Sequence, residues 1–194
     1  MNVYHVKNLS KIYKNRVIFT DVTFIVPEGS IFCIYGKNGS GKSTLLRILY
    51  SVMQPDDGDI TFNYSNNKAC LCTQFPEHLI YHSRLIDEIG SLTGDCKISE
   101  EILTELGLME KKEIFPFHLS DGEKRLIFLY SYIRTKDLLL LDEPFANLDD
   151  ESRTKFFNYV DRCSLKNRTI IYSSNRKKDK VFADNVYDLG SFIL

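Results

Sequence analysis

No stretch of the 194 residues approaches the roughly 20 consecutive apolar residues that a membrane-spanning helix needs. The opening residues, Met1 to His5, also lack the basic and then apolar pattern of a secretory signal. The net charge of −1 is too small for a general attraction to nucleic acid or to acidic lipid. We therefore expect a cytosolic protein whose partners are chosen by local sites and whose contact with a membrane is peripheral.

Cysteine is too sparse and too irregular for a disulfide framework. Five cysteines, an odd number, lie at positions 33, 70, 72, 96 and 163, which favours reduced thiols. Cys70 and Cys72 have a spacing that a metal site could use, but no second pair of cysteine or histidine lies near them. Their period of two instead predicts one face of a buried strand.

Internal repeats, low-complexity tracts and long linkers are also absent. A length of 194 residues allows one substantial core and is too short for two full-sized domains. The composition, 43% apolar and 26% charged, is that of an ordinary globular protein. We expect a single domain over residues 1–194.

The order of predicted elements indicates an α/β protein. Short alternating strands over residues 3–9, 17–20 and 22–26 predict an antiparallel opening. Strands are then expected over residues 30–35, 66–74, 137–141 and 169–173, with a closing pair over 186–194, and helices over residues 43–53, 99–106, 122–134 and 151–163. Such alternation predicts a mostly parallel sheet covered on both faces. A small helical lobe is expected over about residues 75–117.

A glycine-rich segment over residues 36–43 (GKNGSGKS) joins a predicted buried strand to a predicted helix and fits the P-loop pattern. The glycines let the backbone aim N–H groups at phosphate oxygens, and the helix N-terminus adds partial positive charge. Lys42 is placed to reach the β- and γ-phosphates of ATP, and the Ser43 hydroxyl to ligate Mg²⁺. A glycine turn with a chance lysine is the disfavoured alternative. The expected nucleotide contacts are Gly36, Lys37, Asn38, Gly39, Ser40, Gly41, Lys42, Ser43 and Thr44.

Four leucines at positions 138–141 are followed by Asp142 and Glu143. A buried strand of a parallel sheet delivers such terminal side chains to the edge where ligands bind. Asp142 can hold Mg²⁺, directly or through water, and Glu143 can polarise the attacking water. Alone, acids after a strand more often mark a solvated turn, but downstream of a P-loop we prefer the interpretation as a site.

The order of these motifs resembles the ATP-binding-cassette family over nearly the whole chain. Residues 119–123 (LSDGE) are similar to the family signature Leu-Ser-Gly-Gly-Gln, with a plain serine-capped helix start as the alternative. The resemblance implies that Ser120 and the N–H of Gly122 contact the γ-phosphate held by a second subunit. It also implies the fold of a P-loop NTPase: a mostly parallel sheet, an N-terminal antiparallel β subdomain and a small helical lobe.

Three further positions are assigned by this resemblance. Tyr13 lies where the family stacks an aromatic ring on adenine, and a core aromatic is the alternative. Gln74 matches the Q-loop glutamine, which touches the Mg²⁺ site and senses the transmembrane partner. Residues 146–149 (ANLD) resemble the D-loop of the dimer interface, so Asp149 is either a dimer contact or the N-cap of the next helix.

Two residues depart from the family pattern. Asp121 replaces the first signature glycine, where its charge would oppose a triphosphate unless the side chain turns away. Asn175 occupies the place of the switch histidine that contacts the γ-phosphate, and its amide is shorter and never cationic. The four histidines, at positions 5, 78, 82 and 118, lie elsewhere. The implied catalytic set is therefore Glu143, Gln74 and Asn175, and we expect slow hydrolysis.

Length separates the functions that the family carries out. The 45 residues between Gln74 and Ser120 contain no sustained heptads, unlike the long coiled coil of DNA-organising members, and ribosome-associated members have two cassettes. The resemblance therefore implies an ATP-hydrolysing transporter subunit that dimerises on ATP with a second nucleotide-binding domain and drives a separate transmembrane permease. It would work at the inner face of the cell membrane, without nucleic acid. A regulatory or scaffold cassette that binds ATP but hydrolyses little is the alternative.

Overall fold

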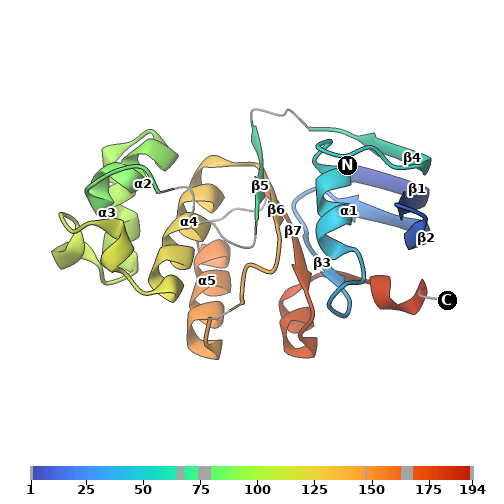
Figure 1. Ribbon diagram of the computed structural model, residues 1–194. Helices are drawn as coiled ribbons and strands as arrows, with labels where there is room; N and C mark the ends of the chain where they lie inside the picture. The colour runs from blue at the N-terminus through green and yellow to red at the C-terminus, as the bar shows by residue number, and fades with distance from the viewer. Residues whose placement is uncertain (1, 65–67, 74–79, 147, 163–167, 193–194) are drawn as a thin grey trace. The chain divides into compact units, whose positions relative to one another are not determined.

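The computed structural model describes residues 2–64, 68–73, 80–146, 148–162 and 168–192, and its chain divides into two compact units (Figure 1). Unit 1 comprises residues 1–72, 137–144 and 165–194. Unit 2 comprises residues 73–136 and 145–164. Unit 1 contains both sheets and the P-loop segment, and unit 2 contains most of the helices.

The antiparallel opening predicted for the chain is confirmed. β1 (Asn2–Tyr13), β2 (Arg16–Pro27) and β4 (Asp57–Phe62) form a sheet in the order β2-β1-β4. Lys14 and Asn15, with φ of 46° and 65°, make the two-residue turn between β1 and β2. The prediction of two strands over residues 17–26 was wrong, because β2 runs through Asp21 with only a change of register.

The second sheet is parallel throughout. It contains β3 (Ile31–Tyr35), β5 (Ala69–Cys72), β6 (Leu138–Leu141), β7 (Thr169–Ser174) and β8 (Asn185–Asp188), in the order β5-β6-β7-β3-β8. Every residue of β6 and β7 is buried, as expected for central strands of a parallel sheet. The closing strand pair expected over residues 186–194 was wrong: β8 is single, and a 3-10 helix (Leu189–Phe192) follows it.

The helix α1 (Lys42–Leu49) follows the P-loop segment and packs in the core of unit 1. Leu45, Leu46 and Leu49 are each at most 1% exposed, and the Tyr4 hydroxyl donates to the Leu49 carbonyl at 2.8 Å, which satisfies one helix-end acceptor. The predicted continuation to residue 53 was wrong, because Val52 is 65% exposed and the helix ends before it.

Unit 2 is built from α2 (Leu85–Thr93), α3 (Cys96–Glu105), α4 (Asp121–Thr135) and α5 (Asp150–Arg162), with 3-10 helices at Met109–Lys111 and Pro116–His118. The rings of Tyr130 on α4 and Tyr159 on α5 stack with centroids 4.1 Å apart. Arg134 donates to both the Tyr159 hydroxyl and Glu101 on α3, which joins three helices. Helices α2 and α3 lie in the span, about residues 75–117, where the sequence predicts a small helical lobe.

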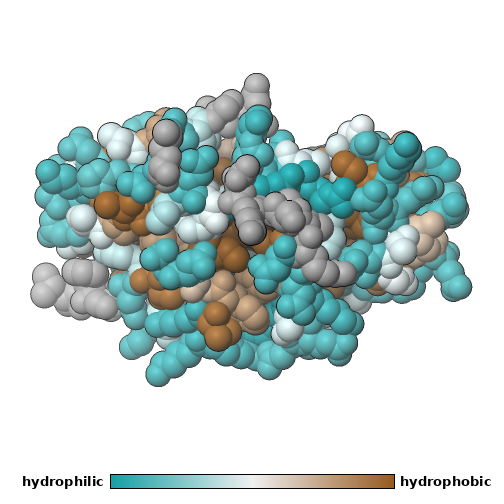
Figure 2. Space-filling view, turned by 180° about the vertical axis from the view of Figure 1, so that it is seen from behind, coloured by the Kyte–Doolittle hydropathy of each residue, from teal (hydrophilic) through white to brown (hydrophobic). Residues whose placement is uncertain are grey.

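The surface and the thiols agree with the composition. Figure 2 shows patches of hydrophobic residues among hydrophilic ones on one face of the molecule. None of the helices in the described ranges combines the length and the apolar composition of a membrane-spanning segment. Cys33, Cys70 and Cys72 are buried and form no disulfide, as predicted, and burial raises the pKa of Cys33 to about 11, which keeps it protonated. Cys163 lies outside the described residues.

Candidate nucleotide site

The predicted site residues of unit 1 meet at one edge of the parallel sheet. The P-loop segment follows β3, Asp142 and Glu143 follow β6, and Asn175 follows β7. β6, β7 and β3 are consecutive neighbours and run in the same direction. Their carboxyl ends therefore lie side by side, at the edge where open α/β sheets bind ligands.

The P-loop segment has the backbone that its glycines predict. The Gly36 N–H donates to the Ser174 carbonyl at 3.1 Å, which fixes the start of the loop on β7. Gly39 and Gly41 have φ of 80° and 94°. A Cβ at Gly41 would also lie 2.6 Å from the Ile18 side chain, so this position requires glycine for its conformation and for its space.

Donors at the start of α1 lack side-chain acceptors in the described part of the chain. No side chain caps the N-terminus of α1, so the first N–H groups of this helix receive no side-chain hydrogen bond. The Ser40 hydroxyl is buried and has no hydrogen-bond partner among the described residues. Unsatisfied donors at a helix N-terminus form a site for an anion, which fits a triphosphate.

Lys42 connects the loop to the acidic residues after β6. Its side chain is only 4% exposed, and its ammonium donates to the Gly36 and Lys37 carbonyls at 3.0 Å each. The same ammonium lies 3.3 Å from Glu143 Oε1. A buried ammonium is stable only when such oxygens compensate for lost water, and phosphate oxygens can take their place.

Asp142 and Glu143 are joined through a residue that we did not predict. The Ser173 hydroxyl donates to Asp142 Oδ1 at 2.7 Å and accepts the Glu143 N–H at 2.8 Å. Ser173 is fully buried, and Asp142 is 9% exposed. The only sequence signal is the first of two serines that end the strand TIIYSS, which by itself predicts nothing.

Asn175 lies beside the P-loop, as the order of motifs predicts. Its side chain is exposed and its amide donates to Asn38 Oδ1 at 2.6 Å. The Ser174 hydroxyl is turned inward, where it donates to the buried Asp179 at 2.5 Å and accepts the Arg176 N–H at 3.0 Å. Of these two polar residues, Asn175 is therefore the one that is exposed beside the P-loop.

Tyr13, assigned to the adenine, is the last residue of β1 and is 58% exposed. The alternative of a core aromatic is therefore wrong. The ammonium of Lys14 lies 5.6 Å from the ring centroid, and the ring is accessible to a flat partner.

In unit 2, the signature segment begins α4 with a capping box. The Ser120 hydroxyl accepts the Glu123 N–H at 3.2 Å, and Glu123 accepts the Ser120 N–H at 2.8 Å. Asp121 turns to Lys124, 2.8 Å away, and this hydrogen bond lowers the pKa of its carboxyl. Among the described residues, a Cβ at Gly122 would come nearest to the Leu148 side chain, at an ordinary 3.6 Å. Local packing therefore does not require this glycine.

Asp149 is the N-cap of α5, which is one of the two roles that the sequence allows for it. Its carboxylate accepts the Ser152 N–H at 2.7 Å, and this bond lowers its pKa. Gln74 lies outside the described residues, so its predicted contact with the metal remains a prediction.

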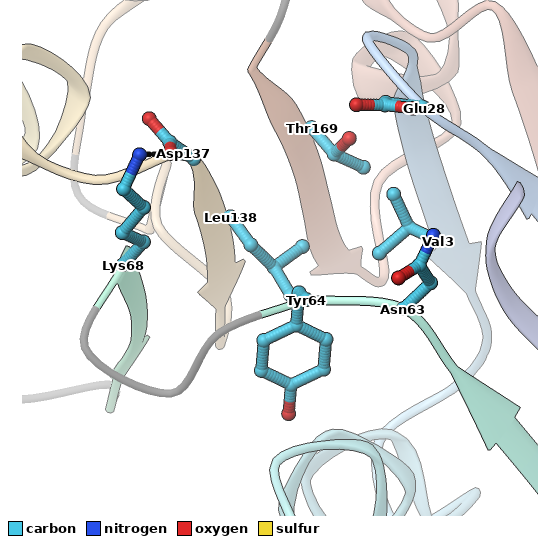
Figure 3. A pocket seen from close by; sticks show the side chains of 8 residues that line it. All are labelled: Val3, Glu28, Asn63, Tyr64, Lys68, Asp137, Leu138 and Thr169. Atoms are coloured by element: carbon cyan, nitrogen blue, oxygen red, sulfur yellow. Dashed lines mark ion pairs between the residues drawn. The ribbon is translucent and has the colours of Figure 1, made fainter. Parts of the chain in front are cut away.

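A cavity of about 380 Å³ in unit 1 lies at the opposite ends of the strands (Figure 3). Lys68, Leu138 and Thr169 line it, just before or at the starts of β5, β6 and β7. Lys68 pairs with Asp137 at 2.9 Å, and Thr169 Oγ1 accepts the Gly29 N–H at 3.0 Å. These polar groups satisfy one another, and we assign no chemistry to the cavity.

The fold and this edge define a P-loop nucleotide-binding protein. The model of the ABC transporter family matches residues 19–146, and the chain belongs to this family. It is an ATP-binding subunit of this class and an ATPase.

Curated relatives and solved structures agree with this placement. The chain is 28% identical to "Energy-coupling factor transporter ATP-binding protein EcfA1" of Fusobacterium nucleatum, over 96% of this chain and 78% of the relative. It is 32% identical to "Aliphatic sulfonates import ATP-binding protein SsuB 1" of Paracoccus denitrificans, over 97% of this chain and 80% of the relative. The structure of cbiO1 from Clostridium perfringens, part of the ABC transporter complex cbiONQ, matches with a TM-score of 0.81 at 21% identity, over 100% of this chain and 87% of that one. A putative ABC transporter ATP-binding protein from Pyrococcus furiosus matches with a TM-score of 0.82 at 20% identity, over 98% and 99%. The predicted fold class is confirmed.

Proposed function

We propose that this chain binds Mg-ATP on residues 36–44 and hydrolyses it with Glu143, working on a separate transmembrane permease at the inner face of the membrane. The observation that carries the proposal is the meeting of Lys42, Glu143 and Asn175 at the carboxyl edge of the parallel sheet. Three elements far apart in sequence bring a cation, a carboxylate and an amide to a loop with uncapped N–H groups. Phosphoryl transfer depends on such positioned charges.

The donor set also fits magnesium. Mg²⁺ prefers oxygen ligands and is usually held by one or two carboxylates together with substrate phosphates. Among the described residues, no group of three acidic, histidine or cysteine side chains forms a closed cage. Ser43 and Asp142, with Gln74, would hold the ion against the phosphates, where it neutralises their charge.

Lys42 would release Glu143 for catalysis when ATP binds. Its three donors are now directed at the Gly36 and Lys37 carbonyls and at Glu143. Phosphate oxygens compete for the same ammonium, and charge-assisted bonds to phosphate are strong. Binding of ATP would therefore draw Lys42 toward the β- and γ-phosphates, and Glu143 would turn to the water that attacks.

A second copy, or a related cassette, completes the site. The single chain provides the loop, the cation and the carboxylates, while the signature lies on the other unit at the start of α4. In a head-to-tail dimer, Ser120 and the N–H of Gly122 of one subunit would approach the γ-phosphate of the other. Asp149 would then contact the partner in addition to capping α5.

The permease contact is proposed for unit 2. Among its described residues, three aromatic side chains are exposed: Tyr81 is 80% exposed, Phe115 42% and Phe117 51%. Exposed aromatic side chains are typical of protein interfaces. The relatives named above are ATP-binding proteins of transport systems, which supports a transport partner for this chain. The test is phosphate release by the purified chain with and without the co-purified membrane subunit: Mg²⁺-dependent release raised by that subunit is expected, and release unaffected by it would contradict this role.

Asn175 sets the expected rate of hydrolysis. Loss of one transition-state donor costs roughly 3 kcal/mol, or about a hundredfold in rate, and an asparagine amide retains only part of this effect. We expect Asn175→His to raise kcat by about tenfold, with KM nearly unchanged, in a steady-state assay of phosphate release.

Two companion variants complete this test. Asn175→Ala should lower kcat further, because it removes the amide that now donates to Asn38. Arg176→Ala tests whether the neighbouring guanidinium supplies the γ-phosphate contact instead. Brisk wild-type turnover that neither Asn175 variant changes would show that the residue is no switch. Tight ATP binding with no turnover in any variant would favour the regulatory cassette, which Asn175 and Asp121 support.

A further inference from the structure

Ser173 stands at the centre of the hydrogen bonds that join the two acidic residues. β6 and β7 pair in parallel with Leu141 opposite Tyr172. The next residues along the chain, Asp142 just after β6 and Ser173 on β7, are therefore also adjacent. The Ser173 hydroxyl has one proton, which it donates to Asp142 Oδ1, and its oxygen accepts the Glu143 N–H.

This arrangement determines the direction of the Asp142 carboxylate. Oδ1 is taken by Ser173 at 2.7 Å, and Asp142 has no second side-chain hydrogen bond among the described residues. The Asp142 N–H is fixed separately by the Cys72 carbonyl at 2.9 Å. With both the backbone and one oxygen held, the other oxygen has a defined orientation, as a metal ligand requires.

The same hydroxyl supports a costly backbone conformation. Glu143 has φ of 46°, in the left-handed region that a residue with a long side chain rarely adopts. Such a conformation is strained and persists only where the surroundings hold it. The bond from the Glu143 N–H to Ser173 is one such restraint, at 2.8 Å.

We propose that Ser173 is a positioning residue that directs Asp142 to Mg²⁺ and holds Glu143 in place, so that one hydroxyl couples the metal ligand to the catalytic carboxylate. The inference rests on the proposed function, which gives Asp142 to the metal. A buried serine need not have such a role: Ser131 on α4 is equally buried and has no hydrogen-bond partner for its hydroxyl among the described residues. Ser131→Ala is therefore the matched control.

The readout is the ratio of the dissociation constant of a fluorescent ATP analogue in EDTA to that in Mg²⁺. Residues that orient metal ligands typically change metal affinity by about 10- to 100-fold. We expect Ser173→Ala to lower the ratio about tenfold and leave the constant in EDTA unchanged. Ser173→Thr, which keeps the hydroxyl, should restore the ratio, and Ser131→Ala should match wild type.

Asp142→Asn separates the two hypotheses. If Asp142→Asn leaves the ratio at its wild-type value, Asp142 is not a metal ligand and the proposed function fails at this residue. If Asp142→Asn lowers the ratio and Ser173→Ala does not, only the role of Ser173 is overturned. When both act, the double variant should show no further fall, because Ser173 acts through Asp142.

A measurement without metal or nucleotide tests the second contact. Hydrogen exchange at the Glu143 amide in the wild-type protein should be slowed by more than about 100-fold relative to an unfolded peptide, and Ser173→Ala should remove most of this protection. Exchange of the wild-type amide at the rate of an exposed loop would overturn the proposal, even if Ser173→Ala did not fold.

Discussion

Lys42→Ala is expected to abolish nucleotide binding. Lys42 is the buried cation of the loop, and its ammonium is held among three protein oxygens. Phosphate oxygens of ATP are expected to bind the same ammonium in a similar way. Charge-assisted hydrogen bonds are each worth about 1.5–3 kcal/mol, and Lys42 is placed to make two. The dissociation constant of a fluorescent ATP analogue should therefore rise by more than about 100-fold.

The control for this variant is a lysine of the same charge in another part of the chain. Lys155→Ala removes an exposed lysine that pairs with the exposed Glu151 on α5, and it should bind the analogue as wild type does. Circular dichroism would show that both variants are folded. Undiminished binding by Lys42→Ala would contradict the assignment of the P-loop.

Glu143→Gln is expected to keep ATP bound and to lower kcat by about 10²- to 10⁴-fold. The amide preserves the shape of the side chain and cannot act as the base, and general-base catalysis contributes an effect of about this size. Glutamate and glutamine have side chains of the same shape and would adopt the same backbone conformation, with φ of 46°, so the fold should not change. Single-turnover release of phosphate, measured with retention of ATP on a filter, separates binding from chemistry.

Two outcomes would contradict this prediction. Turnover at the wild-type rate would show that Glu143 is not the catalytic base. Loss of ATP binding would show that Glu143 is needed to bind the nucleotide. Its ion pair with Lys42, at 3.3 Å, would then be needed to position that lysine.

The P-loop could be predicted from sequence because its residue types follow from the local backbone conformation and the space around it. Gly41 needs a φ of 94° and has no space for a Cβ, and Lys42 follows at the start of a helix. These requirements lie within a few adjacent residues. The order of the remaining motifs then placed Asp142, Glu143 and Asn175 at the same edge of the sheet.

Ser173 could not be predicted because its role depends on pairing between distant strands. Its partner Asp142 is 31 residues away, and only the register of β6 against β7 brings the two together. The strand β4 was not predicted either. Asp57, Gly58 and Asp59 interrupt its apolar alternation, and it is held by pairing with β1.

Helix ends were the least accurate part of the prediction for a similar reason. Val52 continued the apolar spacing of α1, but the chain turns away after Tyr50, and Ser51 takes a φ of 62°. At the end of the chain, apolar residues after β8 resemble a strand, whereas the structure has a 3-10 helix there. The spacing of apolar residues in a sequence does not show whether a neighbouring element packs against those residues in the fold.

The most direct test of the account is a crystal structure of Glu143→Gln with Mg-ATP. We predict a dimer in which the triphosphate lies on residues 36–44, with Lys42 on the β- and γ-phosphates and with Ser120 and Gly122 of the partner copy on the γ-phosphate. Mg²⁺ should lie between the phosphates and the side chains of Ser43 and Asp142. Nucleotide bound elsewhere on the chain, or a monomer whose P-loop is empty at millimolar Mg-ATP, would contradict the account.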